Sequence, residues 1–131
     1  MLKIVNLAQS NFITLDVEPI GKPRLTQRDK WANRPCVTRY WEFKDAINLI
    51  CNSKNFKLAD RFSIVFHVKM SKSWSKKKRA EKLGTEHDQK PDIDNMLKAV
   101  MDSLLDDDSK VCAVNMEKYW AEKGYVEIMN K

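Results

Sequence analysis

The most constraining feature of this sequence is a run of apolar residues with helical spacing between residues 93 and 105. Its members are Ile93, Met96, Leu97, Val100, Met101, Leu104 and Leu105. Residues three and four positions apart lie on one side of an α-helix, so this segment presents a continuous apolar face. It therefore predicts a long amphipathic helix that packs on another layer of the fold.

Segments of alternating apolar and polar residues surround this helix, and the alternation predicts half-buried β-strands. Four strands are expected, over residues 12–18, 62–70, 111–120 and 125–129. Two further helices are expected, over residues 41–51 and, as a short basic helix ended by Gly84, within residues 71–83. Between residues 19 and 40, Gly21 and the prolines exclude a long regular element.

The order of these elements predicts the fold class. The sequence of strand, helix, strand, two helices and two strands favours a single α+β domain over residues 1–131. Its sheet should be mixed or antiparallel, with the helices packed on one face. No apolar run approaches the roughly 20 residues that span a bilayer.

The three cysteines, Cys36, Cys51 and Cys112, are odd in number and widely spaced. This spacing argues against a disulfide framework or a zinc ribbon, and it suits a reducing cytoplasm. Cys51 and Cys112 are expected to be small, buried apolar residues.

Charge is distributed unevenly along the chain. The formal net charge is +6, yet residues 22–90 hold 18 Lys or Arg against 7 acids, whereas residues 91–131 hold 5 against 9. A basic surface points to an anionic partner such as nucleic acid. The acidic part then requires an explanation of its own.

Acidic residues gather at both ends of the predicted long helix. Asp92 and Asp94 open the helix, and Asp106, Asp107 and Asp108 follow it directly. Because the helix turns the chain back after about three turns, the second group is expected to fold toward the first.

Ordinary structural roles account for some of these residues. An Asp at a helix start caps free N–H groups, worth about 1 kcal/mol. Lys98 can pair with Asp94 or Asp102 along the outer stripe of the helix, worth about 0.3 kcal/mol. A run of Asp before a strand often forms a solvated turn. These roles leave the number of acids unexplained, since a helix C-terminus disfavours negative charge.

Mutual repulsion decides between these interpretations. Two carboxylates about 4 Å apart repel by roughly 4 kcal/mol at an effective dielectric constant near 20. A convergent cluster therefore needs a cation, and Mg²⁺ prefers carboxylate and water oxygens and leaves positions for a substrate phosphate. An acidic metal site within a basic surface is the arrangement that a nuclease requires.

The segment "KPDIDNMLKAVMDSLLDDDSKV", residues 90–111, resembles the signature of the RusA family of Holliday junction resolvases, often carried by phages and prophages. That pattern is Asp-x-Asp-Asn at the start of a helix, a Lys four residues after the second Asp, and an acidic pair before a strand. The matching residues here are Asp92, Asp94, Asn95, Lys98, Asp107 and Asp108. The earlier "GKPRLTQRDKW" is similar to the basic, proline-containing loop of phage-type members.

The resemblance implies a function and a site. Family members cut four-way DNA junctions as homodimers in recombination and repair, with one active site per strand, and leave ligatable 5′-phosphate ends. By resemblance, Asp92, Asp94 and Asp108 would bind Mg²⁺, with Mn²⁺ as a possible substitute, and Lys98 would be the essential lysine.

One departure from the family pattern leaves the third carboxylate open. Family members usually have several residues between the helix end and the acidic pair, whereas here Leu105 runs directly into Asp106. Either Asp107 or Asp108 therefore takes the third metal position.

The chemistry of phosphodiester hydrolysis gives Lys98 a role. The reaction needs an in-line water and stabilisation of charge on the phosphate and the leaving oxygen. Lys98 follows Asp94 by one turn, so it is placed to contact the scissile phosphate. Flanking Asp residues favour its charged form, so we expect phosphate stabilisation rather than proton donation.

Candidate DNA contacts form two basic clusters around tryptophans. The first comprises Lys22, Arg24, Arg28, Lys30 and Arg34, with Trp31 among them. The second comprises Lys76, Lys77, Lys78 and Arg79 beside Trp74, and Lys90 lies directly before the acidic segment. Each cluster is either a phosphate-binding surface or a solubilising face. Trp31 and Trp74 are expected in the partial core rather than as a wedge at the junction centre.

The two histidines are expected outside the site. His67 lies within a predicted strand and is interpreted as structural, and His87 lies in a predicted loop and is expected to face solvent.

Three other functions compete with a resolvase. Another metal-dependent nuclease for flaps or linear duplexes would share the chemistry and differ in substrate. A DNA-binding module without a metal would explain the basic half but not the acids. A phosphoacceptor domain of the receiver type also uses acids and a Lys, but at the ends of early parallel strands.

Overall fold

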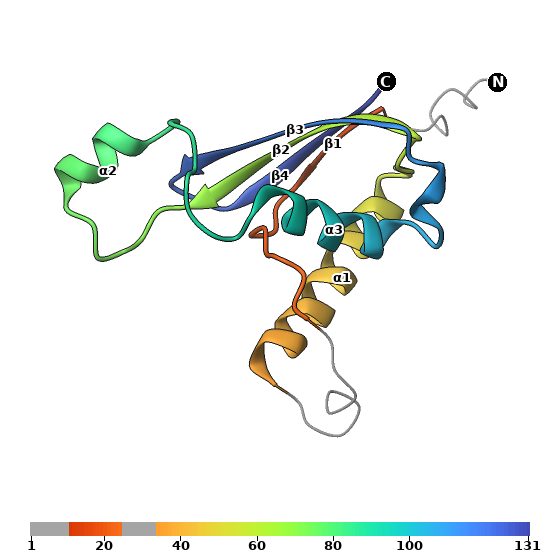
Figure 1. Ribbon diagram of the computed structural model, residues 1–131, viewed down its shortest axis with the longest axis horizontal. Coiled ribbons are helices and arrows are strands. Elements are labelled where there is room, and N and C mark those ends of the chain that lie inside the picture. Colours follow the sequence, from red (N-terminus) through yellow and green to blue (C-terminus); the bar gives the residue numbers. More distant parts are fainter. Residues whose placement is uncertain (1–10, 25–33) are drawn as a thin grey trace.

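A four-stranded mixed sheet carries the fold in this computed structural model, which describes residues 11–24 and 34–131 (Figure 1). The strands are β1 (Phe12–Leu15), β2 (Arg61–Lys69), β3 (Ala113–Ala121) and β4 (Tyr125–Asn130). Their order is β1-β4-β2-β3. Strand β4 is antiparallel to β1 and β2, and β2 is parallel to β3.

The helices are α1 (Pro35–Ser53), α2 (Lys76–Lys82) and α3 (Ile93–Leu104), and a short 3₁₀ helix, η3 (Asp108–Lys110), precedes β3. The two longer helices, α1 and α3, lie over one face of the sheet (Figure 1). Figure 1 shows α1 and α3 on the same side of the sheet, while α2 stands beyond its end. The predicted α+β fold with a mixed sheet and helices on one face is therefore confirmed.

The core lies between the sheet and the apolar face of α3. Alternate residues of β2 and β4 point toward the helices and are fully buried: Phe62, Ile64, Phe66, Val126 and Ile128. Met96, Ala99 and Val100 of α3 pack against them and are also fully buried. Burial of each large apolar side chain contributes about 1.5–3 kcal/mol, so this contact sets the position of α3 and of the acids at its ends.

Helix α1 begins earlier than the sequence predicted. The prolines indicated irregular chain as far as residue 40, but α1 starts at Pro35. A proline is tolerated in the first helical turn because its missing N–H would have no partner there. Strand β1 is shorter than predicted because the chain turns after Leu15. At this turn, Val17 N–H donates a hydrogen bond to the Leu15 carbonyl.

The cysteines are free thiols, and their burial only partly follows expectation. Cys51 is buried within α1, as predicted, but Cys112 is exposed. Cys112 lies in the segment leading into β3, where its backbone N–H bonds the carbonyl of Asp60 at the end of the sheet. In the described ranges, no helix has the length and apolarity to cross a membrane.

The face of the sheet opposite the helices holds His67. Its ring stacks on Tyr125 at a centroid distance of 3.9 Å, and its Nε2 lies 2.6 Å from Oε1 of Glu127. Both partners are on β4, so these contacts support the structural interpretation of His67.

Candidate active site

Two unpaired carboxylates stand at the N-terminus of α3. Asp92 is the N-cap residue, yet its side chain makes no capping hydrogen bond. Asp94 lies in the first turn, and both side chains are exposed. Within residues 11–24 and 34–131, neither carboxylate accepts a hydrogen bond or forms an ion pair. The Asp92 side chain therefore does not cap the helix, and its carboxylate oxygens are open to solvent.

Lys98 lies one helical turn after Asp94 and is exposed. An ordinary surface lysine at this position would pair with Asp94 or Asp102. Among the described residues, no ion pair joins Lys98 to either of them. Its ammonium is consequently available to a ligand beside the two carboxylates.

The acids after α3 lie at its other end. The helix has 12 residues, which at about 1.5 Å per residue separates its ends by about 18 Å. Asp107 and Asp108 lie at or within η3, before β3 runs back toward the start of the helix, so they stay at the far end of α3. Among the described residues, no three His, Cys, Asp or Glu side chains are grouped to hold a metal. The expected convergence of Asp107 and Asp108 with Asp92 and Asp94 is thus absent from this chain.

Asp107 and Asp108 differ in what they contact. The Asp107 carboxylate accepts a hydrogen bond of 3.0 Å from Ser109 N–H and so caps η3. Hydrogen bonds from Ser109 hold the pKa of Asp107 below its ordinary value. Asp108 is exposed, and its side chain has no partner in the part of the chain that the structure describes. Of the two, Asp108 is the one whose carboxylate remains available.

The donor set at the start of α3 suits one Mg²⁺ ion. Magnesium is commonly bound by one or two carboxylates, with waters and substrate phosphates in the remaining positions. Asp92 and Asp94 supply two carboxylates of this kind, both exposed and unpaired. A third protein carboxylate is not needed for such a site.

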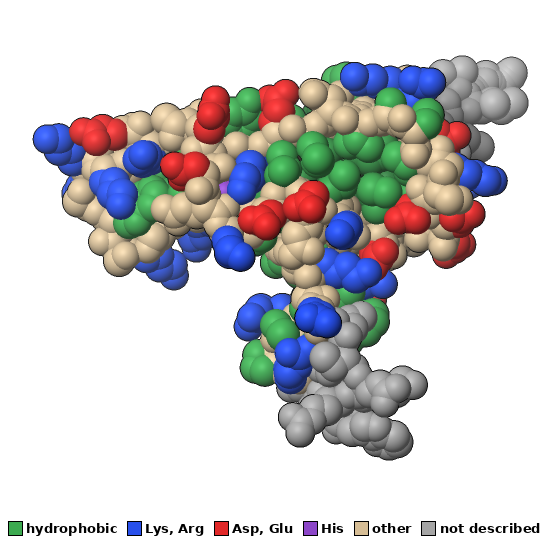
Figure 2. Space-filling view, in the orientation of Figure 1, with side chains coloured by type: hydrophobic (Ala, Val, Ile, Leu, Met, Phe, Trp, Pro, Cys, Tyr) green, Lys and Arg blue, Asp and Glu red, His purple; other side chains and the backbone are tan. Residues whose placement is uncertain are grey.

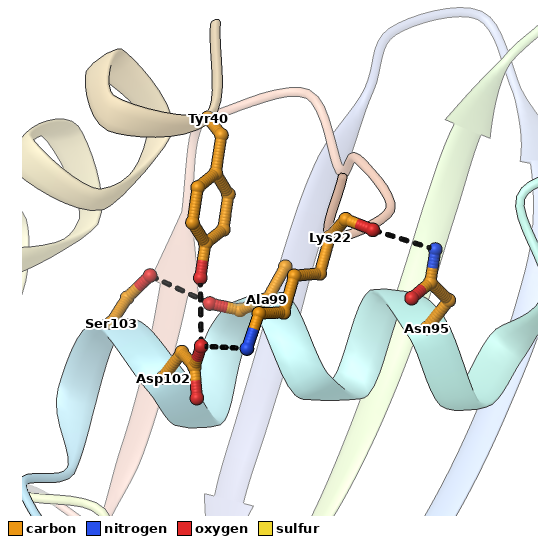
Figure 3. A network of polar contacts seen from close by, with 6 residues as sticks. All are labelled: Lys22, Tyr40, Asn95, Ala99, Asp102 and Ser103. Carbon is orange, nitrogen blue, oxygen red and sulfur yellow. Dashed lines mark hydrogen bonds and ion pairs between the residues drawn. The ribbon is translucent and has the colours of Figure 1, made fainter. Parts of the chain in front are cut away.

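The loop over residues 19–24 is fastened to the first turn of α3 by Asn95. Lys22 N–H donates to the Asn95 carbonyl at 3.2 Å, and Asn95 Nδ2 donates to the Lys22 carbonyl at 3.1 Å (Figure 3). Gly21 permits this approach, because a Cβ there would come within 2.7 Å of Asn95 Nδ2. The sequence motif contains Asn95, but only the fold shows it to be a positioning residue.

Lys22 is engaged within the protein rather than free for DNA. Its Nζ lies 2.5 Å from Asp102 Oδ2, and the Tyr40 hydroxyl donates to the same oxygen at 2.9 Å (Figure 3). Burial favours a higher pKa for Asp102, but the hydrogen bonds from Lys22 and Tyr40 outweigh it and lower the pKa. In this structure the Lys22 ammonium holds the loop to α3 and α1, while its predicted contact with DNA stays a prediction.

Replacing Asp102 with asparagine is expected to reduce the loss of stability in acid. The ordinary pKa of 3.8 describes the unfolded chain, and the folded pKa is lower, so the unfolded state takes up the proton first. The carboxylate's contribution to the free energy of unfolding is therefore complete above about pH 5 and is lost as pH falls through both values. Urea unfolding of Asp102→Asn should depend less on pH than that of the native protein.

The matched control for this prediction is Asp45→Asn, an exposed aspartate on α1. It should keep the native pH dependence. If Asp102→Asn also kept it, the network of Lys22, Tyr40 and Asp102 would contribute nothing to acid sensitivity.

Lys118 of β3 supports the segment that leads into Asp92. Its Nζ donates to the carbonyls of Gln89 and Pro91, at 2.8 Å and 3.0 Å. Because Lys118 is distant in sequence from these residues, no local pattern indicated this role.

His87 is buried rather than solvent-exposed as predicted, with 4% of its surface accessible. The segment before it pairs with β3 through a bridge between Glu86 and Tyr119, and the His87 ring lies 4.3 Å from that of Trp120. Burial, followed by the charge of Lys118, lowers the pKa of His87. The His87 imidazole therefore packs against β3, and its burial disfavours the charged form.

The basic helix α2 is anchored to the sheet by aromatic contacts. Trp74 is half-buried, as expected for partial core, and packs edge-on against Trp120 at 4.7 Å. Lys78 Nζ lies 4.2 Å from the centroid of the Trp74 ring. Arg79 donates to the Ser71 carbonyl, so its guanidinium also stabilises this loop.

The remaining predicted DNA contacts are exposed or lie outside the described residues. Lys76, Lys77, Lys90 and Arg24 are exposed, and the Arg24 carbonyl accepts a hydrogen bond from Arg34. Arg28, Lys30 and Trp31 lie outside the described residues. Figure 2 shows basic side chains gathered over α2 and over the N-terminal end of α1. Acids and basic surfaces thus occupy neighbouring parts of one face.

Comparison with known proteins agrees with this arrangement. The family model described as endodeoxyribonuclease RusA matches residues 16–130. A protein of Bacillus subtilis (strain 168), described as uncharacterized protein YqaN, is 30% identical over 128 residues, which cover 86% of this chain and 89% of that protein. Since the family match covers β2, β3, β4 and all three α-helices, which is most of the chain, the chain belongs to the RusA family of endodeoxyribonucleases.

Proposed function

We propose that this protein is a Mg²⁺-dependent resolvase that cuts four-way DNA junctions by paired hydrolysis of phosphodiester bonds. The observation that carries the proposal is the exposed stripe of α3, where Asp92 and Asp94 lie about one turn from Lys98 and none of the three has a side-chain partner among the described residues. Membership of the RusA family supplies the substrate class.

Each residue of this stripe has a separate task in the proposed reaction. Asp92 and Asp94 would hold Mg²⁺, and the bound ion would supply activation of water and charge neutralisation at the phosphate. Lys98 would contact the scissile phosphate and stabilise the charge that develops on it. Asn95 and Lys118 orient the turn that carries the carboxylates, through Lys22 on one side and Pro91 on the other.

Asp108 is proposed as a further carboxylate of the reaction, with Asp107 as the alternative. Asp108 is favoured because Asp107 already caps η3. Within one chain the distance along α3 keeps either residue from Asp92 and Asp94, so this assignment rests on the resemblance to the family. A homodimer, also proposed by resemblance, would present two active sites to the junction.

DNA would be held by the basic surfaces on either side of the acids. The exposed lysines of α2 lie on a helix that stands beyond the sheet, where it can reach a neighbouring duplex arm (Figure 1). Their task is to bind phosphates, which carry no sequence information themselves.

Substitution of Lys76 and Lys77 together by alanine is expected to weaken junction binding and to lessen its salt dependence. Each phosphate contact contributes about 0.9 to the slope of log affinity against log salt, so the slope should decrease by about 1.8. Equilibrium binding at several salt concentrations measures it. The control is Lys54 and Lys57 together changed to alanine, two exposed lysines at the far end of α1. An unchanged slope in the α2 variant would exclude that helix from the DNA surface.

The direct test of the proposed function is cleavage of a labelled mobile four-way junction with Mg²⁺, beside linear duplex and flap substrates. Paired symmetric nicks in the junction alone are expected. Equal cleavage of flaps or duplexes would instead make the protein a less selective metal-dependent nuclease. Tight binding without cleavage under any divalent ion would leave a DNA-binding module and remove the catalytic role of the carboxylates.

A further inference from the structure

A cavity of about 500 Å³ opens beside the first turn of α3 and is separate from the carboxylates themselves. Its walls come from the loop over residues 19–24, from the start of α1 and from the residues just before Asp92. The residues that matter for its chemistry are Pro19, Ile20, Pro23, Pro91, Arg39 and Lys90. Its volume is within the roughly 300–1,000 Å³ typical of small-ligand sites.

The walls of this cavity combine a rigid apolar surface with two cations. Three prolines and Ile20 give an apolar wall, and the proline rings have little conformational freedom to lose when a ligand binds. Arg39 and Lys90 are exposed, and neither forms an ion pair or side-chain hydrogen bond within the described residues. Lys22 also lines the cavity, but its ammonium is already bound to Asp102. The cavity is therefore lined by an apolar wall and by two cations that have no ion-pair partner in the part of the chain that the structure describes.

We propose that this cavity receives a single nucleotide displaced from the base stack beside the bond that is cut. Its base would lie on the wall of prolines, and its phosphate would lie between Arg39 and Lys90. The chemistry fits because a nucleotide joins a flat base, whose two faces can stack on an apolar wall, to an anionic phosphate. The location fits as well, since Pro91 and Asn95 line the cavity while Asp92 and Asp94 belong to the same turn.

This inference rests on the proposed function and adds a reason for junction selectivity. Nucleotides at a branch point are less well stacked than those within a duplex, so they are displaced at lower cost. A cavity that must be filled before the phosphate reaches the carboxylates would therefore favour branched DNA over linear duplex.

The test uses junctions with the fluorescent base 2-aminopurine placed, one position at a time, around the crossover. Asp94→Asn protein is used because it is expected to bind the junction without cutting it. Displacement of the base should raise its fluorescence severalfold at one position. The described residues that line the cavity include no aromatic side chain to quench the signal. Adding Arg39→Ala should abolish this rise, whereas Arg61→Ala, which removes an exposed arginine at the start of β2, should leave it unchanged.

A second measurement follows Cys36, whose side chain lines the same cavity. In a Cys112→Ser background, where the exposed thiol is removed and Cys51 stays buried, junction DNA should slow alkylation of Cys36 severalfold. Deoxycytidine monophosphate alone serves as the second arm. Protection by the mononucleotide but not by DNA would make the cavity a site for free nucleotides and overturn its role in junction recognition.

The outcomes separate this inference from the proposed function. If the native protein cuts junctions, but 2-aminopurine fluorescence rises at no position and DNA does not slow alkylation of Cys36, the proposed nucleotide site is wrong. The proposed resolvase function would still stand. If the native protein neither binds nor cuts junctions, the proposed function fails, and the nucleotide site fails with it.

Discussion

Replacing Asp94 by asparagine is expected to lower the rate of junction cleavage at least about a hundredfold, with junction affinity nearly unchanged. Loss of a metal ligand costs more than the roughly 10- to 100-fold seen when an outer partner of a ligand is removed. Asparagine keeps the shape of the side chain but not its charge, and the carboxylate is exposed, so the fold should be unaffected. Single-turnover cleavage with saturating Mg²⁺ measures the rate, and a separate titration measures binding.

The matched control for this substitution is Asp106→Asn. Asp106 is also an exposed aspartate, but it follows the opposite end of α3 and has no assigned role. It should cut at nearly the native rate. Full activity of Asp94→Asn would remove the carboxylate from the reaction, and equal loss in both variants would show only a general effect of negative charge.

Replacing Lys98 by alanine is expected to reduce single-turnover cleavage by about 10²- to 10³-fold, which is the usual cost of removing one stabilising donor from a developing oxyanion. Because the proposed role of Lys98 is in the transition state, the dissociation constant for the junction should change far less than the rate. Lys98→Arg should recover only part of the activity, since a planar guanidinium does not place its charge as a compact ammonium does.

The control for Lys98 is Lys110→Ala, which removes an exposed lysine from η3 at the other end of α3. Its cleavage rate should be close to native. Full activity of Lys98→Arg would mean that positive charge alone suffices, and equal weakening of binding and cleavage in Lys98→Ala would make the residue a simple phosphate contact.

Local patterns in the sequence were sufficient for much of the fold. The periodicity of residues 93–105 depends only on contacts within one helix and between that helix and any apolar surface, so it identified α3 almost to the residue. Alternation identified β2 for the same reason. The Asp-x-Asp-Asn motif and its spaced lysine indicated the family because motif residues are adjacent in the chain.

The prolines show where local patterns misled. They were correctly interpreted as incompatible with a helix interior, but Pro35 occupies the first turn of α1, where the usual penalty does not apply. The exposure of His87 was also predicted wrongly. Its burial depends on β3, which is distant in sequence and pairs with the segment just before His87.

The site itself was decided by tertiary structure. Lys22 resembled the other loop cations in sequence, yet in the fold it binds Asp102, and Arg39, unremarkable in sequence, faces the cavity. Asp107 and Asp108 were expected beside Asp92, but the rise of α3 holds the two groups apart.

The sequence by itself therefore determined which chemical groups this protein carries and which elements hold them. It could do so because helix and strand periodicity and motif spacing are local properties. Only the tertiary structure decided which of those groups remain unpaired. That outcome depends on partners such as Tyr40, Asp102 and Lys118, which are distant in sequence and meet only when α1, α3 and β3 pack together.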